Sequence, residues 1–325
     1  MSQKILLVGT GTMAQEYAKV LLADKIPFDA VGRGSDKASA FAEITGVLPH
    51  AGGLKPWIAA QKTIPAAAII AVDVPNLAQA SLELIDRGVR RLLVEKPAGL
   101  NEEEVRRLSA AAGKAEAGVY VAYNRRYYAS TRRAREIIAE DGGARSCHFD
   151  FTEWSAKIAR TKHPPAVKEQ WFFVNSTHVA DLAFFLSGDP KTLHSQTSGS
   201  LPWHPAASIF TGSGLTQSAA LFSYQANWEA PGRWGVEITT RKRRLILRPL
   251  EELYIHNEGS LTPEKAALDD ADDKCFKPGL RRQLRAFLDG RDDGLLPIED
   301  HLRRTREIFR PMVYPRAVRE TAPSP

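Results

Sequence analysis

The chain has 325 residues, of which 43% are hydrophobic and 25% charged, a composition typical of a soluble globular protein. No apolar run approaches the roughly 20 residues of a membrane helix. Two cysteines without a C-x-x-C pair predict a reducing, cytoplasmic setting and no disulfide framework. The net charge of +6 comes without a nucleic-acid motif, so we expect an anionic cofactor or substrate rather than a nucleic acid.

The first predicted element is a buried strand over residues 5–8, which leads directly into a turn of the form G-x-G-x-x-A and then into a helical pattern. This order is the dinucleotide-binding fingerprint, in which Gly9 allows a tight turn, Gly11 admits a pyrophosphate and Ala14 permits close helix packing. The alternative is a glycine turn in an unrelated α/β protein. The cofactor contacts expected here are Gly9, Thr10, Gly11, Thr12 and Met13, beside a helix N-terminus.

The second predicted strand covers residues 27–31 and favours NADP over NAD, although NAD stays possible. NAD-binding proteins usually close this strand with an acidic residue that holds the ribose. Here Arg33 occupies that position, and a guanidinium pairs with a 2′-phosphate. Ser35 and Lys37 lie within reach of the same phosphate, whereas Asp29 falls inside the strand and is interpreted as structural. The alternative for Arg33 is an exposed loop residue.

Further strands are predicted over residues 66–72, 91–94 and 119–122, and each is separated from the next by a helical pattern. Strands and helices that alternate in this way predict a parallel, doubly wound sheet. Ligands of such sheets bind at the carboxyl ends of the strands. We therefore expect Asp73, Asn76 and Glu95 to contact the cofactor. Asn101 and Glu104 form a capping box for the helix that follows the fourth strand.

Lys96 follows the fourth strand directly and precedes Pro97. An ammonium at this edge of the sheet can polarise a carbonyl or stabilise a developing alkoxide during hydride transfer. Pro97 has a fixed φ and restricts the residue before it to extended conformations, which aims the lysine side chain. We therefore expect Lys96 to contact cofactor and substrate and to act in catalysis, the alternative being a surface lysine.

The glycine turn, the E-K-P sequence at Lys96 and the Y-N-R-R-Y sequence at residues 123–127 together resemble the glucose–fructose oxidoreductase, inositol dehydrogenase and rhizopine catabolism (Gfo/Idh/MocA) family. The resemblance implies an α/β chain with a Rossmann domain over residues 1–122. It also implies an α/β domain with an open, mostly antiparallel sheet over residues 123–325, whose closing helices pack back on the first domain. The implied activity is hydride transfer between a nicotinamide and a sugar-like hydroxyl or carbonyl, in a homodimer or homotetramer.

The junction between the two domains supplies two further site residues. We expect Asn124 to face the cofactor and Arg126 to face the substrate. Ser130 or Thr131 is predicted to cap the basic helix that follows. Residues 147–154 alternate in the manner of a sheet strand, and residues 156–168 are interpreted as a loop that borders the active site.

His178 lies in the stretch Asn175–Asp181, which is predicted to begin a helix. In the family that this chain resembles, a histidine at this place is commonly the catalytic acid–base, and H-x-x-D follows it, as Asp181 does here. Asn175 and His178 are therefore expected to contact the substrate, and Asp181 to be structural. The family often carries an aspartate four residues before the histidine, where this chain has Val174. The alternative for His178 is a capping or packing residue.

The remaining sequence predicts strands near residues 219–224, 235–239 and 245–247, and closing helices over residues 279–288 and 298–309. Trp203, Trp228 and Trp234 are candidates for a sugar site, although packing is the alternative for each. The open sheet of the family often forms a dimer interface, where exposed aromatic residues are expected. The acidic run at residues 269–273 is predicted to be a solvated loop, and no histidine or cysteine spacing indicates a metal site.

These features predict a cytoplasmic NADP-dependent oxidoreductase that acts on a sugar or sugar derivative, with Lys96 polarising the reacting oxygen and His178 moving its proton. A reductase of a non-sugar carbonyl and an NAD-dependent glycosidase use the same scaffold and remain alternatives. A non-catalytic nucleotide sensor is a third alternative, because Val174 leaves His178 without its usual acidic partner.

Overall fold

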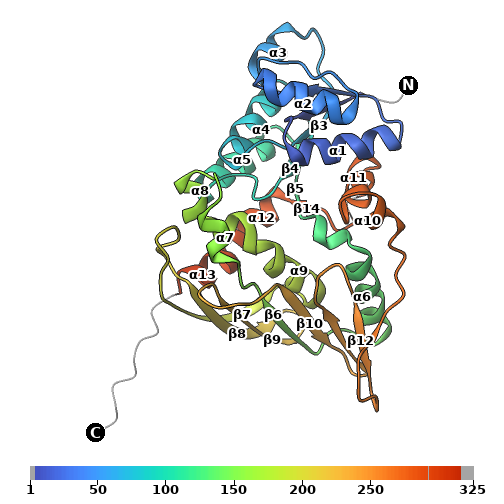
Figure 1. The fold of residues 1–325 in the computed structure, drawn as a ribbon, viewed down its shortest axis with the longest axis vertical. Helices are drawn as coiled ribbons and strands as arrows, with labels where there is room; N and C mark the ends of the chain where they lie inside the picture. Colours follow the sequence, from blue (N-terminus) through green and yellow to red (C-terminus); the bar gives the residue numbers. More distant parts are fainter. Residues whose placement is uncertain (1–3, 292, 316–325) are drawn as a thin grey trace.

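Two β-sheets organise the molecule, one toward each end of its long axis (Figure 1). The computed structural model describes residues 4–291 and 293–315. In that part of the chain, no helix is both long enough and apolar enough to cross a membrane.

The N-terminal sheet, sheet A, contains the predicted parallel strands. Its order is β14-β5-β4-β3-β1-β2, and the neighbouring strands are parallel except that β14 runs antiparallel to β5. A single parallel bridge between Val31 and His50 extends the sheet beyond β2. The strands are β1 (Ile5–Val8), β2 (Phe28–Val31), β3 (Ala67–Ile70), β4 (Arg91–Glu95), β5 (Gly118–Ala122) and β14 (Leu296–Pro297). The doubly wound α/β prediction is confirmed, and the apolar runs are those of strands covered on both faces.

Helices cover both faces of sheet A and form a separate apolar core on each. One face carries α1 (Thr12–Ala23) and α11 (Leu280–Leu288), and the other carries α3 (Leu54–Ala60), α4 (Leu77–Asp86), α5 (Glu102–Lys114) and α12 (Ile298–Arg304). Helix α2 (Ser35–Thr45) follows β2 and packs against α1. Asn101 caps α5 by accepting a hydrogen bond from the Glu104 amide at 3.0 Å, as predicted, while Glu104 accepts from the amide of Leu100.

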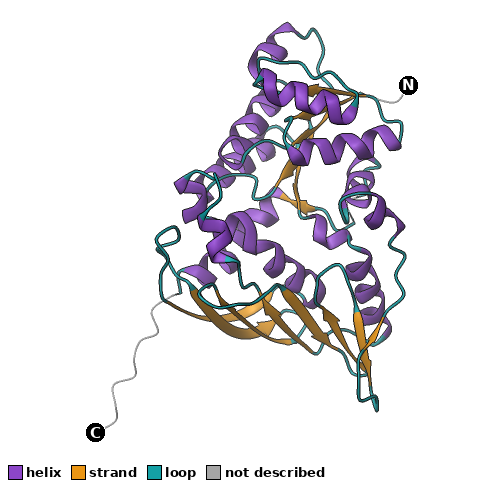
Figure 2. Cartoon of the chain, viewed as in Figure 1, coloured by secondary structure: helices purple, strands orange, loops and turns teal. Residues whose placement is uncertain are grey.

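The second sheet, sheet B, has the order β13-β12-β11-β10-β6-β9-β8-β7 and is antiparallel except for the β6–β9 pair. The mostly antiparallel sheet is therefore confirmed. Figure 2 shows that helices cover only one face of it. The strands are β6 (Ser146–Asp150), β7 (Pro190–Ser198), β8 (Ile209–Thr216), β9 (Leu221–Asn227), β10 (Gly235–Thr239), β11 (Arg243–Leu247), β12 (Tyr254–Asn257) and β13 (Glu264–Lys265). The helices on its covered face include α6 (Ala129–Glu140), α9 (Thr177–Ser187) and α13 (Arg310–Val313).

The bare face of sheet B is polar along the paired strands β8 and β9. Alternate residues of β8 and β9 are exposed, and they include Thr211, Ser213, Ser223 and Gln225. The aromatic residues of the same strands point into the core instead, because the strand period of two sends neighbours to opposite faces. Exposed aromatic residues were expected on this face, and that expectation is wrong for these two strands.

Tertiary contacts also correct three local predictions. Neither Ser130 nor Thr131 caps α6, because both hydroxyls donate to backbone carbonyls elsewhere, and Asp273 instead accepts from the Ala129 amide at 2.7 Å. The acidic run that was predicted to be a solvated loop contains α10 (Ala271–Cys275) as well as this cap. The segment predicted as a loop after β6 contains α7 (Ser155–Ala159) and α8 (Pro165–Glu169).

Candidate active site

The turns that follow β1, β2 and β3 border one groove of about 770 Å³ at the carboxyl edge of sheet A. Gly9 has a φ of +127°, and a Cβ on it would lie 2.2 Å from the Ala71 carbonyl oxygen, so only glycine fits this turn. A Cβ on Gly11 would meet no atom within 4 Å, which leaves its backbone open to the groove. Ala14 is fully buried, as close packing of the helix against the strand requires. These features match the requirements of a dinucleotide pyrophosphate.

Arg33, Ser35, Asp73 and Asn76 also line this groove, as predicted from their positions after the strands. The Arg33 guanidinium donates to the Asn76 side-chain oxygen at 3.3 Å and lies 3.8 Å from the Asp73 carboxylate. Lys37 lies 3.8 Å from the same carboxylate. The Arg33 and Asp73 side chains are each 67% exposed, so water screens the charges at this end of the groove.

Five other residues predicted to contact the cofactor, among them Lys96, lie outside the groove lining. Thr12 is exposed at the start of α1, and Met13 packs against the core beneath that helix. Glu95 accepts a hydrogen bond from the buried Tyr17 hydroxyl at 2.8 Å, and burial raises the pKa of this carboxyl. Asn124 is buried, and its side-chain amide donates to the Pro278 carbonyl at 2.9 Å, so it faces away from the groove.

Lys96 lies at the end of β4, where its ammonium donates to the Val174 carbonyl oxygen at 2.5 Å. This contact joins the edge of sheet A to the helix that carries His178. Burial lowers the pKa of Lys96 to about 8, with Arg125 and Lys277 acting in the same direction and the carboxylates of Glu95 and Glu153 opposing. Lys96 has a neutral hydrogen-bond partner, so its charge is available to another ligand.

His178 is 5% exposed and packs edge-on against the Tyr123 ring, with the ring centroids 5.6 Å apart. Its Nδ1 is buried and has no hydrogen-bond partner among the described residues. Burial lowers the pKa of His178 well below its usual value, and the nearby charges of Arg125, Lys96 and Lys277 add to the effect. The imidazole is therefore neutral at neutral pH.

His178 does not begin its helix, which corrects the prediction made for residues 175–181. A π-helical turn, η3 (Phe172–Ser176), runs directly into α9, so the ring projects from inside a continuous helix. The positive end of the helix dipole is therefore not what disfavours the imidazolium. Burial and three neighbouring cations do so instead.

A pocket of about 360 Å³ lies between sheet B and helices α7 and η3, and Asn175 lines it as predicted. Glu153 also lines this pocket, accepting from the Asn175 amide at 2.9 Å and from the Ser176 hydroxyl at 2.7 Å. It is only 7% exposed, and burial raises the pKa of this carboxyl. A carboxylate from another segment thus contacts the helical turn that contains Val174. Sequence reasoning missed Glu153, and the only available signal was its position just after the β6 strand.

Arg126, which was predicted to contact the substrate, does not line this pocket. Its guanidinium is buried and forms two hydrogen bonds to the Asp181 carboxylate, at 2.7 and 2.6 Å. Arg304 donates to the same carboxylate at 2.8 Å. These contacts join α9 and α12 to the turn η2 (Asn124–Tyr127), which gives Asp181 the structural role expected of it.

The three tryptophans proposed for a sugar site separate into two groups. Trp203 and Trp228 stack on each other, with the ring centroids 5.7 Å apart, and Trp228 is buried in the core of sheet B. Only Trp234 lines the pocket, where its ring centroid lies 6.3 Å from that of His178. Packing therefore explains Trp203 and Trp228, and Trp234 stays a candidate for substrate contact.

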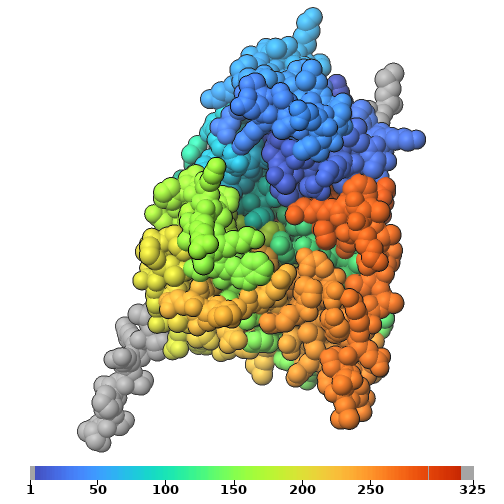
Figure 3. Space-filling model, viewed as in Figure 1, coloured from blue at the N-terminus to red at the C-terminus, as the bar shows by residue number. Residues whose placement is uncertain are grey.

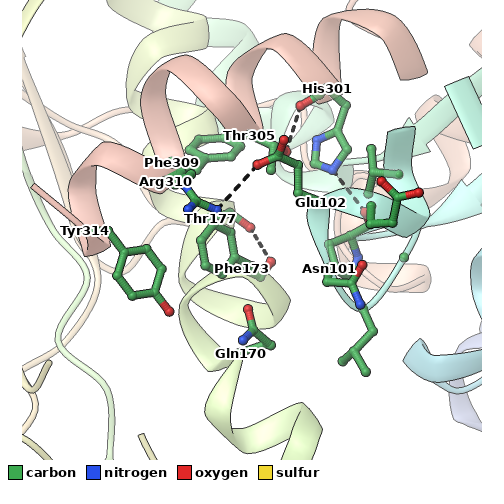
Figure 4. Close-up of a pocket in the computed structure, with 15 residues that line it drawn as sticks. Asn101, Glu102, Gln170, Phe173, Thr177, His301, Thr305, Phe309, Arg310 and Tyr314 are labelled. Atoms are coloured by element: carbon green, nitrogen blue, oxygen red, sulfur yellow. Dashed lines mark hydrogen bonds and ion pairs between the residues drawn. The ribbon is translucent and has the colours of Figure 1, made fainter. Parts of the chain in front are cut away.

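A second cavity, of about 510 Å³, lies between the start of α5 and helices α12 and α13 (Figure 4). His301 borders it and shares a hydrogen bond of 3.0 Å with the Pro97 carbonyl oxygen, while Arg310 lies 3.6 Å from Glu102 across it. Neither Lys96 nor His178 lines this cavity. Neither residue lines the pocket that contains Glu153 and Asn175, but Trp234 of that pocket lies beside the His178 ring, so this pocket is the better candidate for the substrate site. Figure 3 shows the surface recessed where the blue N-terminal part meets the green and orange parts of the chain.

The described residues contain no group of three histidine, cysteine or acidic side chains placed to hold a metal ion. Cys147 is buried and Cys275 exposed, and both are free thiols.

No protein-family model and no curated protein matches this chain. Solved structures do match. A putative NADPH-dependent oxidoreductase from Desulfitobacterium hafniense has a TM-score of 0.76 at 16% identity, covering 93% of this chain and 92% of its own. The UDP-N-acetylglucosamine 3-dehydrogenase of Acidithiobacillus ferrooxidans has a TM-score of 0.72 at 15% identity over 97% of each chain.

Levoglucosan dehydrogenase, in a complex with NADH and levoglucosan, has a TM-score of 0.73 at 17% identity, covering 93% of this chain and 94% of its own. The likeness of these three structures confirms the two-sheet fold that the Gfo/Idh/MocA resemblance predicts. At this level of identity the likeness concerns the fold, and the activity has to be argued from the site.

Proposed function

We propose that this protein is an NAD(P)-dependent oxidoreductase that transfers a hydride between a nicotinamide and a hydroxyl or carbonyl carbon of a sugar or sugar derivative. The observation that carries the proposal is the hydrogen bond from Lys96, at the carboxyl edge of sheet A that also carries the glycine groove, to Val174, which lies four residues before His178 in the same continuous helix. The activity and ligand described for levoglucosan dehydrogenase, which shares the fold, support it.

The groove after β1, β2 and β3 would hold the dinucleotide, with the pyrophosphate against Gly9, Thr10 and Gly11. When bound, the nicotinamide accepts or donates the hydride. Arg33 favours NADP because its exposed guanidinium can pair with a 2′-phosphate, and Lys37 adds a second positive charge beside it.

Lys96 would polarise the reacting oxygen. Its ammonium donates to a neutral carbonyl rather than to a carboxylate, so its positive charge is not cancelled by a direct ion pair. A substrate oxygen beside it would become more negative when the alcohol loses its proton or when the carbonyl carbon gains hydride, and a buried ammonium stabilises that charge. The positive charges of Arg125 and Lys277, which lower the pKa of Lys96, also favour negative charge on the substrate oxygen.

His178 would move the proton of that oxygen. Because its imidazole is neutral at neutral pH, it is ready to accept a proton during alcohol oxidation. During carbonyl reduction it would act as the imidazolium, a form that burial and the adjacent cations make rare. The neutral imidazole that prevails at neutral pH is thus the form required for alcohol oxidation.

The test is a panel of sugars, sugar acids and sugar alcohols, assayed with NAD and with NADP by nicotinamide absorbance at substrate saturation. We expect net reduction of cofactor by at least one class of substrate, faster with NADP at low cofactor concentration. A glycosidase that uses transient oxidation would release a sugar without net reduction, and a nucleotide sensor would bind cofactor without turnover. Either result would overturn the proposal.

A further inference from the structure

Arg125 is an arginine in the candidate substrate pocket that the protein itself leaves without a charge partner. It lines the pocket, forms no salt bridge within the described chain, and its buried Nε has no hydrogen-bond partner there. The guanidinium lies over the Trp234 ring, 4.8 Å from the centroid, and 5.9 Å from that of Tyr128. Aromatic rings hold a guanidinium in place without occupying its N–H donors.

The neighbouring Arg126 shows what this chain does with an arginine that it uses for structure. Arg126 is 5% exposed and binds both oxygens of Asp181, so its charge is neutralised. Arg125 is one residue away on the same turn, yet it is half-buried and free of any carboxylate among the described residues. A half-buried guanidinium with open donors is costly unless a ligand binds it.

The surroundings of Arg125 add positive charge. Lys157 and Arg233 also line the pocket, and each lies over the Trp154 ring without a salt bridge in the described residues. The two carboxylates of the lining are Glu153 and Glu251. Glu153 already accepts hydrogen bonds from Asn175 and Ser176, so it points its charge at the helix that carries His178.

We propose that the substrate of this site carries an anionic group, a carboxylate or a phosphate, and that Arg125 binds it. This inference rests on the proposed function, because it names the substrate class of the same pocket. The planar fork of a guanidinium matches two oxygens of either anion and gives charge-assisted hydrogen bonds. The pocket volume of about 360 Å³ lies at the low end for small-molecule sites, which favours a single sugar ring.

The test is isothermal titration calorimetry at low salt with the full chain saturated with NADPH and, separately, with NADH. The probes are D-glucuronate, D-glucose 6-phosphate and the neutral parent D-glucose. We expect at least one of the two anions to bind ten times more tightly than glucose, and the one that does identifies the anion as carboxylate or phosphate. Equal affinities, or no detectable binding of both anions, would overturn the inference.

Three variants separate anion recognition from a structural effect. Arg125→Gln should lower affinity for the preferred anion at least tenfold and leave glucose affinity and cofactor affinity within threefold. Arg125→Lys should recover part of the loss, because it restores the charge without the fork. Arg107→Gln removes an exposed arginine of α5 outside the pocket and should change nothing. An Arg125→Gln variant with unchanged anion affinity would contradict the role of Arg125.

The same data distinguish this inference from the proposed function. If an anion binds through Arg125 and no substrate reduces the cofactor, the pocket chemistry stands and the oxidoreductase assignment fails. If neutral sugars are oxidised as efficiently as their acids, the oxidoreductase assignment stands and the anionic substrate class is wrong.

Discussion

The cofactor groove at the carboxyl edge of sheet A and the candidate substrate pocket beside sheet B are built in different ways. The groove consists of short turns that directly follow three strands, and its polar side chains, such as Arg33 and Asp73, are two-thirds exposed. The pocket is lined by distant segments, represented by Arg125, Glu153 and Asn175, and the helix that carries Asn175 also binds Lys96.

The difference in burial decides how strongly the protein alters the pKa of an ionisable group. Charges in the exposed groove are screened by water, so their side chains act through position. Around the helix that borders the pocket, burial and neighbouring cations lower the pKa of both Lys96 and His178. Substitutions in the assembled region should therefore have larger effects than those in the groove.

The largest effect should come from the salt bridge that supports the pocket. Arg126→Ala leaves Asp181 buried with one of its two arginine partners, and we expect the free energy of unfolding to fall by about 3 to 5 kcal/mol. Arg125→Ala, at the adjacent position, should lower it by about 1 kcal/mol, the loss of a cation–π contact. Urea denaturation of both variants measures the difference. If both variants lose the same free energy of unfolding, Arg126 does not have a structural role that Arg125 lacks.

Lys96→Ala should lower kcat by about 10²- to 10³-fold, because the ammonium acts on charge that develops in the transition state. Cofactor affinity should change by less than about threefold, since Lys96 lies outside the groove lining. Lys62→Ala, which removes an exposed lysine away from both sites, is the matched control. A large loss of cofactor affinity would instead make Lys96 a cofactor ligand.

His178→Asn should lower the oxidation rate by about 10²-fold and abolish the decrease of that rate at acidic pH. Because the pKa of His178 is lowered, the neutral base persists below pH 6.5, and the wild-type rate should fall only at more acidic pH. In the reducing direction the rate should rise as pH falls, because the imidazolium becomes populated. A pH–rate profile in each direction tests both signs. A variant with the wild-type rate and the same acid limb would leave proton transfer to Lys96, Tyr123 or water.

The ammonium of Lys96 predicts an alkaline limb in the same profiles. Its pKa of about 8 means that the charged form dominates below that pH and is lost above it, so the oxidation rate should fall about tenfold per pH unit at high pH. Lys96→Arg keeps its charge throughout this range, so any residual activity should lack the limb. Persistence of the limb in Lys96→Arg would assign it to another group.

The smallest effect belongs to the groove. We expect NADP to bind about tenfold more tightly than NAD, and Arg33→Ala to abolish this preference while leaving NAD affinity nearly unchanged. Arg107→Ala serves as a control for loss of an exposed positive charge. Fluorescence titration with both cofactors measures the ratio. A wild type that prefers NAD would reverse the cofactor assignment and leave Arg33 as a surface residue.

Local patterns in the sequence predicted sheet A well, because each strand is an apolar run and each is followed by its own turn. Gly9 and Gly11 illustrate this, since the requirement for glycine comes from backbone geometry within a few residues. The cap at Asn101 was predictable for the same reason. The cap on α6 was not, because Asp273 is far away in the sequence and the nearer Ser130 donates elsewhere.

The sequence by itself determined the fold class, the glycine turn and Lys96 as a site candidate, because those features follow from strand ends, whereas His178 was a candidate through the resemblance to the family. Only the tertiary structure decided which of two adjacent arginines faces the pocket, since Asp181, which also binds Arg304, holds Arg126 in place. It alone also brought Glu153 beside the segment that contains Val174. Burial is a property of the assembled chain, so the shifted pKa values of Lys96 and His178 follow from packing that no local pattern records.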